Sequence, residues 1–145
     1  MAETSVKLLE CEVTSSGLLK IDQIGSGMGV ILYSPSQKIG AGLHILAPRS
    51  GKVAARSPIM YADTAIPHAV EQLAKKGVKP PLSVAIAGGA SLLQSQTAMG
   101  SSQRMIEAVK EALQKVSLQV KLEETGGAKV RSMILDIDAG KIKII

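Results

Sequence analysis

The sequence predicts an α+β protein in which two main helices pack against layered β-sheets. Two segments show the helical period of apolar residues, whereas about seven others show the short apolar runs or the alternation typical of strands. Turn residues at 14–17, 34–37 and 138–140 join several of these strands without room for a crossover helix. Because hairpins outnumber crossovers, we expect layers of sheet and helix rather than a doubly wound parallel sheet.

The first third of the chain is expected to form strands. Residues 6–13 alternate loosely between apolar and polar and predict a first strand. Residues 27–33 and 39–46 are short apolar runs on either side of Ser34-Pro35-Ser36-Gln37, which predicts a hairpin. Residues 47–58 hold two prolines, a glycine and several small or basic residues, and predict a surface loop.

A first helix is expected to begin near Asp63, whose carboxylate suits the free N–H groups and the dipole at a helix N-terminus. Pro67 is tolerated there because it lies close to the first turn. The apolar face of this helix is Ile66, Val70 and Leu73. Lys75, Lys76 and Gly77 are typical of its C-terminus, so the helix should end near them.

The second half of the chain predicts a strand, a helix and three further strands. Residues 82–87 form a short apolar run that leads into Gly88-Gly89. A helix is expected over residues 102–115, with the apolar stripe Met105, Ile106, Val109, Leu113 and Val116. The remaining strands are expected at residues 118–122, 130–138 and 141–145.

Length and composition indicate one globular domain spanning residues 1–145. Hydrophobic residues make up 46% of the chain and charged residues 20%, which fits a folded domain. Tyr33 and Tyr61 are the only aromatic residues, so stacking platforms for nucleobases are lacking. The net charge of +5 comes from scattered lysines and arginines rather than a basic run, and we expect no nucleic-acid partner.

The same inventory argues against membrane insertion, disulfides, metals and cofactors. The N-terminus has no apolar core of a signal peptide, and no apolar run approaches the ~18 residues of a membrane span. Cys11 is the single cysteine, so no internal disulfide is expected. Two scattered histidines and one cysteine do not make a metal site. We expect a cytoplasmic protein without a cofactor.

Three motifs invite a chemical interpretation, and each also has a structural one. Gly25-x-Gly27-x-Gly29 leads into a strand rather than a helix, which argues against a dinucleotide site. His44 lies in an apolar strand and is either a structural histidine or a catalytic base. Cys11 lies between two glutamates, whose charges would raise the pKa of its thiol and disfavour a nucleophile.

Two adjoining segments resemble a known pattern. Ile24-Gly25-Ser26-Gly27-Met28, followed by His44-Ile45-Leu46-Ala47-Pro48, is similar to the nucleophile loop and histidine strand of the CheD family of chemoreceptor glutamine deamidases. That family reads approximately T-x-G-L-G-S-C-V and then H-x-x-L-P. Further resemblances in the same order are Tyr61-Ala62-Asp63-Thr64-Ala65, Ala87-Gly88-Gly89-Ala90, Gly100 with Gln103, and Gly126-Gly127 with Arg131.

The resemblance implies a CheD-like cysteine-hydrolase fold whose chemistry is incomplete. In the family a cysteine attacks a glutamine side-chain amide, a histidine acts as base, and a threonine orients the histidine. His44 occupies the base position, Gly27 the cysteine position and Ile21 the threonine position. Ser26 is the nearest hydroxyl, but it is one residue away from the nucleophile position. Ser26, Gly25, Gly88, Gly89 and Gln103 are the remaining residues expected around the site.

We therefore expect a chemotaxis protein that has lost deamidase activity and acts by binding. The resemblance implies methyl-accepting chemoreceptors and a CheC-type phosphatase as its partners. Two alternatives stay open: an active protein-glutamine amidohydrolase that uses a nucleophile such as Ser26, or a small-molecule sensor. The sensor would use a pocket that Gly27 enlarges and Ile21 makes more apolar.

Overall fold

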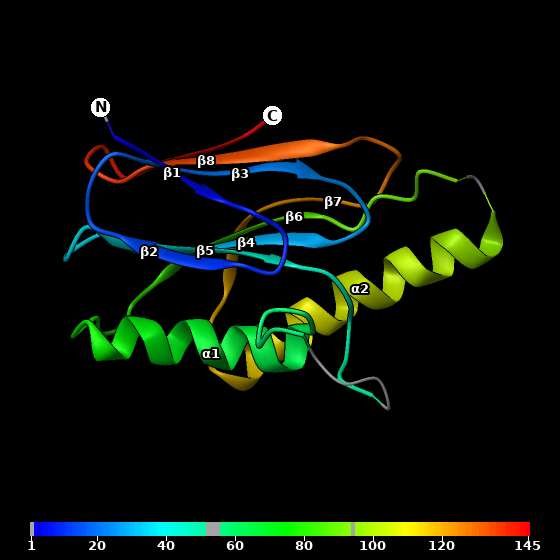
Figure 1. Ribbon diagram of the computed structural model, residues 1–145, viewed down its shortest axis with the longest axis horizontal. Coiled ribbons are helices and arrows are strands. Elements are labelled where there is room, and N and C mark those ends of the chain that lie inside the picture. Colours follow the sequence, from blue (N-terminus) through cyan, green and yellow to red (C-terminus); the bar gives the residue numbers. More distant parts are fainter. Residues whose placement is uncertain (1, 52–55, 94) are drawn as a thin grey trace.

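The computed structural model describes residues 2–51, 56–93 and 95–145. Two stacked β-sheets and a layer of two helices make up the described chain, and Figure 1 shows the helices on one side of the sheets. The helices are α1 (Ala62–Lys75) and α2 (Gln96–Lys115). The predicted α+β class and the two main helices are therefore confirmed.

The middle layer is a five-stranded sheet of order β2-β5-β4-β6-β7, mixed in direction because β6 and β7 are parallel. Its strands are β2 (Cys11–Thr14), β5 (Ile39–Ile45), β4 (Met28–Ser34), β6 (Ser83–Gly88) and β7 (Val120–Thr125). The outer layer is a four-stranded sheet of order β1-β3-β8-β9. Its strands are β1 (Glu3–Val6), β3 (Leu18–Ile24), β8 (Arg131–Asp136) and β9 (Lys141–Ile144).

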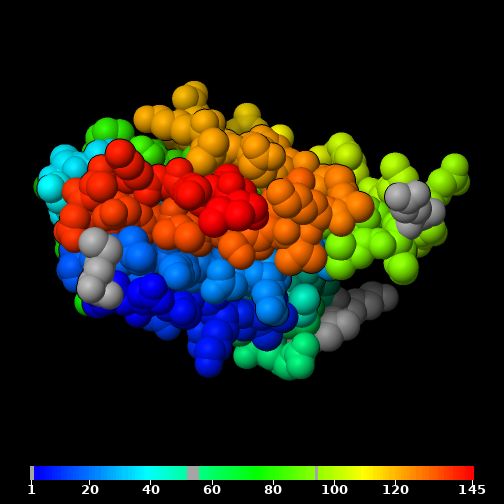
Figure 2. All heavy atoms as spheres, turned by 90° about the horizontal axis from the view of Figure 1, so that it is seen from above, coloured from blue at the N-terminus to red at the C-terminus, as the bar shows by residue number. Residues whose placement is uncertain are grey.

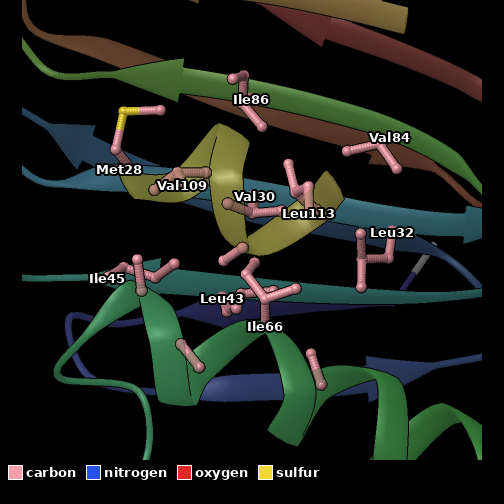
Figure 3. Packing of buried hydrophobic residues seen from close by; sticks show 14 of the residues in the cluster. Met28, Val30, Leu32, Leu43, Ile45, Ile66, Val84, Ile86, Val109 and Leu113 are labelled. Carbon is pink, nitrogen blue, oxygen red and sulfur yellow. The ribbon is translucent and has the colours of Figure 1, made fainter. Parts of the chain in front are cut away.

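Strand β4 is buried along its whole length because it has a packed layer on each face. Val30 faces the helices and lies in the same hydrophobic cluster as Ile66 of α1 and Val109 of α2, as Figure 3 shows. Ile31, one residue further along, points to the opposite face and joins the core between the two sheets. This double burial explains why residues 27–33 are an unbroken apolar run, and the predicted hairpin is confirmed as β4–β5.

The N-terminal expectation was wrong, because residues 6–13 do not form one strand. Leu9 has a positive φ of 71°, and the chain turns there from β1 in the outer sheet to β2 in the middle sheet. Strand β3 was missed, although Leu19 and Ile21 alternate there with Lys20 and are both fully buried.

Helix α1 begins at Ala62, so its expected start near Asp63 is confirmed, but the expected role of Asp63 and the expected start of α2 are wrong. The Asp63 carboxylate does not cap α1 but accepts hydrogen bonds from the backbone N–H and the hydroxyl of Ser50, at 3.0 and 2.8 Å. Tyr61 is the N-cap residue of α1, and its side chain does not form the capping hydrogen bond. Helix α2 begins at Gln96 rather than at residue 102, because Ser95 accepts a hydrogen bond from the N–H of Ala98.

The loop expected at residues 47–58 is mostly irregular where the structure describes it. Ala47 pairs with Tyr61 in an isolated β-bridge, and residues 52–55 lie outside the described residues. Neither α1 nor α2, the two helices of the described chain, is long and apolar enough to cross a membrane.

Candidate functional site

The loop between β3 and β4 meets the end of β5 at one end of the middle sheet. Gly29 of β4 is directly opposite His44 of β5, so the two residues before Met28 extend past the histidine. A Cβ atom placed on Gly27 would lie 3.8 Å from Nε2 of His44. The structure therefore brings together the two residues that the sequence pattern assigned to nucleophile and base.

Backbone hydrogen bonds from the end of β6 hold this loop in place. The N–H of Gly89 donates to the carbonyl of Gly27 at 2.8 Å, and the N–H of Ala90 donates to the carbonyl of Gly25 at 3.0 Å. Gly88 has a φ of +121°, and a Cβ there would collide with the Gly27 carbonyl oxygen. The glycine pair Gly88-Gly89 thus allows two backbones to approach closely, which is a positioning role.

His44 is held by its backbone while one atom of its ring is left unpaired. Its N–H donates to the carbonyl of Glu10 at 3.2 Å, and its own carbonyl accepts from the N–H of Leu9 at 2.9 Å. The side chain is 6% exposed, and its buried Nδ1 has no hydrogen-bond partner among the described residues. Burial lowers the pKa of His44, so the neutral imidazole is the favoured form.

Position 27, which the sequence pattern assigned to the nucleophile, has no room for a side chain. A Cβ on Gly27 would collide with the backbone carbonyl oxygen of Ile45, so the main chain of β5 fills the place of a longer side chain. The expectation that glycine enlarges a pocket there is wrong. A cysteine at position 27 requires this backbone to shift.

Ile21 lies in the core between the sheets, fully buried in the same cluster as Ile24 and Met133. Ile21 does not line the hollow that contains His44. The expectation that Ile21 makes this hollow more apolar is therefore wrong. An isoleucine also has no hydroxyl to donate or accept a hydrogen bond.

An open hollow of about 650 Å³ surrounds the exposed edge of the site. Gly25, Ser26 and Gly27 line it together with His44, and the other lining residues include Lys7, Leu8, Asp22, Gln23 and Leu92. Ser26 is exposed and shares this hollow with His44, so a hydroxyl is present beside the histidine.

Gln103 is placed away from His44. It is exposed on α2 and lines a separate hollow with Met99 and Ile106. A third hollow, lined mainly by apolar residues such as Leu92 and Leu93, lies between the hollow of His44 and the hollow of Gln103. It shares Ser26 with the first and Ser91 and Ser102 with the second. The three hollows therefore form one continuous surface around the ends of the two sheets.

Four exposed apolar side chains border this surface, and sequence reasoning missed them. These are Leu8, Leu92, Leu93 and Met99, which we call the apolar rim; they are 47%, 56%, 72% and 60% exposed. A detectable signal was Leu92-Leu93, an apolar pair in a polar stretch directly after Gly88-Gly89-Ala90-Ser91. Exposed apolar residues gathered beside a concave site are typical of a protein-binding surface.

Cys11 cannot replace the missing nucleophile. It pairs with Leu43 in the β2–β5 ladder and packs against the cluster between helices and sheet, which is the face opposite to His44. Burial and the charge of Glu12 raise the pKa of the Cys11 thiol to about 11. The described residues also contain no group of three histidine, cysteine or carboxylate side chains that could hold a metal ion.

Comparison with known proteins gives one consistent family. The family model described as "CheD chemotactic sensory transduction" matches residues 46–145. The chain is 39% identical over 123 residues to a probable chemoreceptor glutamine deamidase CheD of Methanococcus vannielii, covering 83% of this chain and 80% of that protein. It is 38% identical over 122 residues to the chemoreceptor glutamine deamidase CheD of Thermotoga maritima, covering 83% and 76%. A probable CheD of Desulforamulus reducens is 34% identical over 149 residues, covering 99% and 90%.

Proposed function

Since the chain belongs to the CheD family, we propose that it is a chemotaxis protein that binds the partners of a deamidase without performing deamidation. The observation that carries this proposal is Gly27, which faces Nε2 of His44 where the family has its cysteine. A glycine has no atom that can attack an amide carbon, so the covalent step has no nucleophile.

The remaining site supports loss of chemistry rather than a change of nucleophile. Nδ1 of His44 has no partner among the described residues, and the position of the orienting threonine is the buried Ile21. In Cys-His and Ser-His enzymes a third group fixes the ring and the tautomer of the base, and its loss lowers turnover strongly. Removing an essential nucleophile of such a set costs on the order of a millionfold in turnover.

The apolar rim supports a binding function, because it gathers exposed Leu8, Leu92, Leu93 and Met99 around the same surface. The curated relatives are named chemoreceptor glutamine deamidases, so a chemoreceptor is the first partner to test. A CheC-type phosphatase is the second. Recognition of either partner needs the shape and apolar area of this surface, and it does not need a thiol.

The activity test measures ammonia released from a chemoreceptor cytoplasmic fragment that carries glutamines, with the Thermotoga maritima relative as the positive control. We expect no release above the buffer background. Release by the unaltered chain that disappears in His44→Ala would contradict the proposal. The paired variant Gly27→Cys with Ile21→Thr asks whether the rest of the site is still organised. The cysteine must displace the Ile45 carbonyl in this variant as it must in Gly27→Cys alone, so ammonia release by either variant would show that the backbone of β5 can move.

The binding test uses the same receptor fragment and a CheC-type phosphatase, titrated by calorimetry. Leu92→Glu with Leu93→Glu should weaken binding by about tenfold or more, because it places charges in an apolar contact. Val130→Glu with Ile145→Glu is the matched control, since both residues are exposed apolar residues outside the rim. Failure to bind either partner, or equal weakening by the control, would contradict the proposal.

Ser26 provides the second candidate function, an amidohydrolase with a serine nucleophile. The observation in its favour is that Ser26 and His44 line the same hollow. Against it, Ser26 is exposed and belongs to the loop position next to the family nucleophile. If ammonia release is found, Ser26→Ala should abolish it under this alternative and leave it unchanged under any other.

A further inference from the structure

The two sheets differ by one strand, and this leaves part of the core between them uncovered. Leu122 of β7 is in register with Ala85 of β6, and Ala85 is fully buried in the cluster between the sheets. Neighbours across a ladder point to the same face, so Leu122 faces the space between the sheets as well. Leu122 is nevertheless 39% exposed. Figure 2 shows atoms of this segment, in gold, beyond the red and orange atoms of the outer sheet.

Strand β9 is the edge of the outer sheet on this side, and its free backbone groups can be assigned. Ser132 and Ile145 exchange both backbone hydrogen bonds, at 3.0 and 2.9 Å, which defines them as a hydrogen-bonded pair. Such pairs alternate along an antiparallel ladder, so Lys143 also directs its N–H and C=O toward β8. Ile142 and Ile144 therefore direct theirs away from the sheet, toward a strand position that no described strand occupies.

The side chains of β9 have two distinct characters. Ile142 and Ile144 are half-buried and pack against the core between the sheets, whereas Lys141 and Lys143 are exposed on the outer face. Next to Ile142 lies a hollow of about 440 Å³, lined also by Leu122 and Tyr33. The hollow contains Lys38, Lys121 and the single carboxylate Asp138, so its charge is positive on balance.

We propose that the β9 edge binds an extended segment of a partner protein in which apolar and acidic residues alternate. The backbone of the segment would pair with Ile142 and Ile144 as an additional strand. Its apolar side chains would then cover Leu122 on the inner face, and its acidic side chains would lie beside Lys141 and Lys143 on the outer face. Charge complementarity identifies the occupant as acidic.

The same charges argue against a second copy of this chain as the occupant. Two β9 edges placed side by side would bring Lys141 and Lys143 of both copies together, and lysines on an edge strand oppose such pairing. This edge lies at the Tyr33 end of the β4–β5 hairpin, and the His44 surface lies at the other end. The proposal is therefore independent of the proposed function.

The test titrates the whole protein into a fluorescein-labelled peptide of about six residues in which valine and glutamate alternate, and follows the anisotropy. The comparison peptide has the same composition with the valines in one block and the glutamates in the other. We expect the alternating peptide to bind about tenfold more tightly than the block peptide. Equal binding of both, or binding of neither at millimolar protein, would overturn the proposal.

Variants separate this edge from general electrostatics. Lys141→Glu with Lys143→Glu should weaken binding of the alternating peptide by about tenfold or more. The control Lys7→Glu with Arg104→Glu makes the same charge change away from β9 and should weaken binding much less. Leu122→Gln tests the apolar contact and should also weaken binding, with its folding checked by circular dichroism. Equal loss in the two charge variants, or a dimer through β9 in sedimentation, would overturn the proposal.

Discussion

Tyr33 and His44 are buried polar rings at opposite ends of the same hairpin, and only one of them is fully paired. Tyr33 on β4 is 3% exposed, and its hydroxyl donates to the carbonyl of Ile137 at 2.6 Å. Burial and the charges of Asp138 and Asp136 raise the pKa of Tyr33, which keeps the hydroxyl protonated as a donor. His44 on β5 is 6% exposed, and its Nδ1 has no partner in the described part of the chain.

The difference separates a polar group that the fold pairs from one that has an unpaired ring atom among the described residues. A buried polar atom without a partner costs about 1–3 kcal/mol, so a core that only had to fold would pair it or replace it. Tyr33 joins β4 to the segment between β8 and β9 and thereby ties the two sheets together. The Nδ1 atom of His44 has no such partner among the described residues, so the ring is not tied to the fold through that atom.

The largest expected effect is that of Tyr33→Ala. The change removes a buried ring that packs with Ile31 and Leu135 and leaves the Ile137 carbonyl without its donor. We expect the free energy of unfolding to fall by about 3–5 kcal/mol, measured by urea denaturation. A loss below about 1 kcal/mol would show that Tyr33 does not hold the sheets together.

Tyr33→Phe is the next largest change and isolates the hydrogen bond. The ring is kept, and only the hydroxyl that donates to Ile137 is removed. Because a buried carbonyl then loses its partner, the free energy of unfolding should fall by about 1–2 kcal/mol. Comparison with Tyr33→Ala separates the contribution of the hydroxyl from that of the ring, and a loss equal to that of Tyr33→Ala would contradict this division.

The sequence predicted the hairpin that carries both rings, because a strand buried on both faces is an unbroken apolar run. The left-handed turn at Leu9 that splits β1 from β2 had no such signal, since leucine rarely adopts a positive φ. Strand β3 did have a signal in the sequence, because Leu19 and Ile21 alternate with Lys20. The early start of α2 could be read from Ser95 as an N-cap.

The site was less predictable than the fold. That Gly27 faces His44 followed from the resemblance to a family and not from local periodicity, because the two residues come from different strands. The contribution of Leu8 and Leu92 to the same surface depends on how β1 and the end of β6 are arranged in space. No spacing in the sequence brings these residues together.

The pH dependence of stability is expected to report on His44. Burial lowers its pKa in the folded state, so near pH 6 the folded chain binds fewer protons than the unfolded chain, in which the pKa is about 6.5. The contribution of His44 to the free energy of unfolding is therefore present above pH ~7 and is lost as the pH falls through the folded pKa. Urea denaturation between about pH 7.5 and 5 measures it.

The comparison for this prediction is the same series on His44→Leu. Every other titratable group is the same in both proteins, so the part of the slope that disappears in the variant belongs to His44. Identical slopes in the two proteins would contradict a lowered pKa. A steeper slope in the variant would mean that the protonated imidazole is favoured by the fold.

The smallest expected effect is that of His44→Leu itself at about pH 7.5, where the imidazole is neutral. Leucine has nearly the volume of histidine, and it removes a ring nitrogen that has no partner among the described residues. Replacing an unpaired polar group by an apolar one of similar shape is close to neutral, so the free energy of unfolding should stay within about 0.5 kcal/mol or increase. Tyr33→Leu in the otherwise unaltered chain should lower the free energy of unfolding several times more, because it removes a hydroxyl that donates to the carbonyl of Ile137. A cost of about 2 kcal/mol or more for His44→Leu would mean that the imidazole is paired after all, and the histidine would then belong to the fold as Tyr33 does.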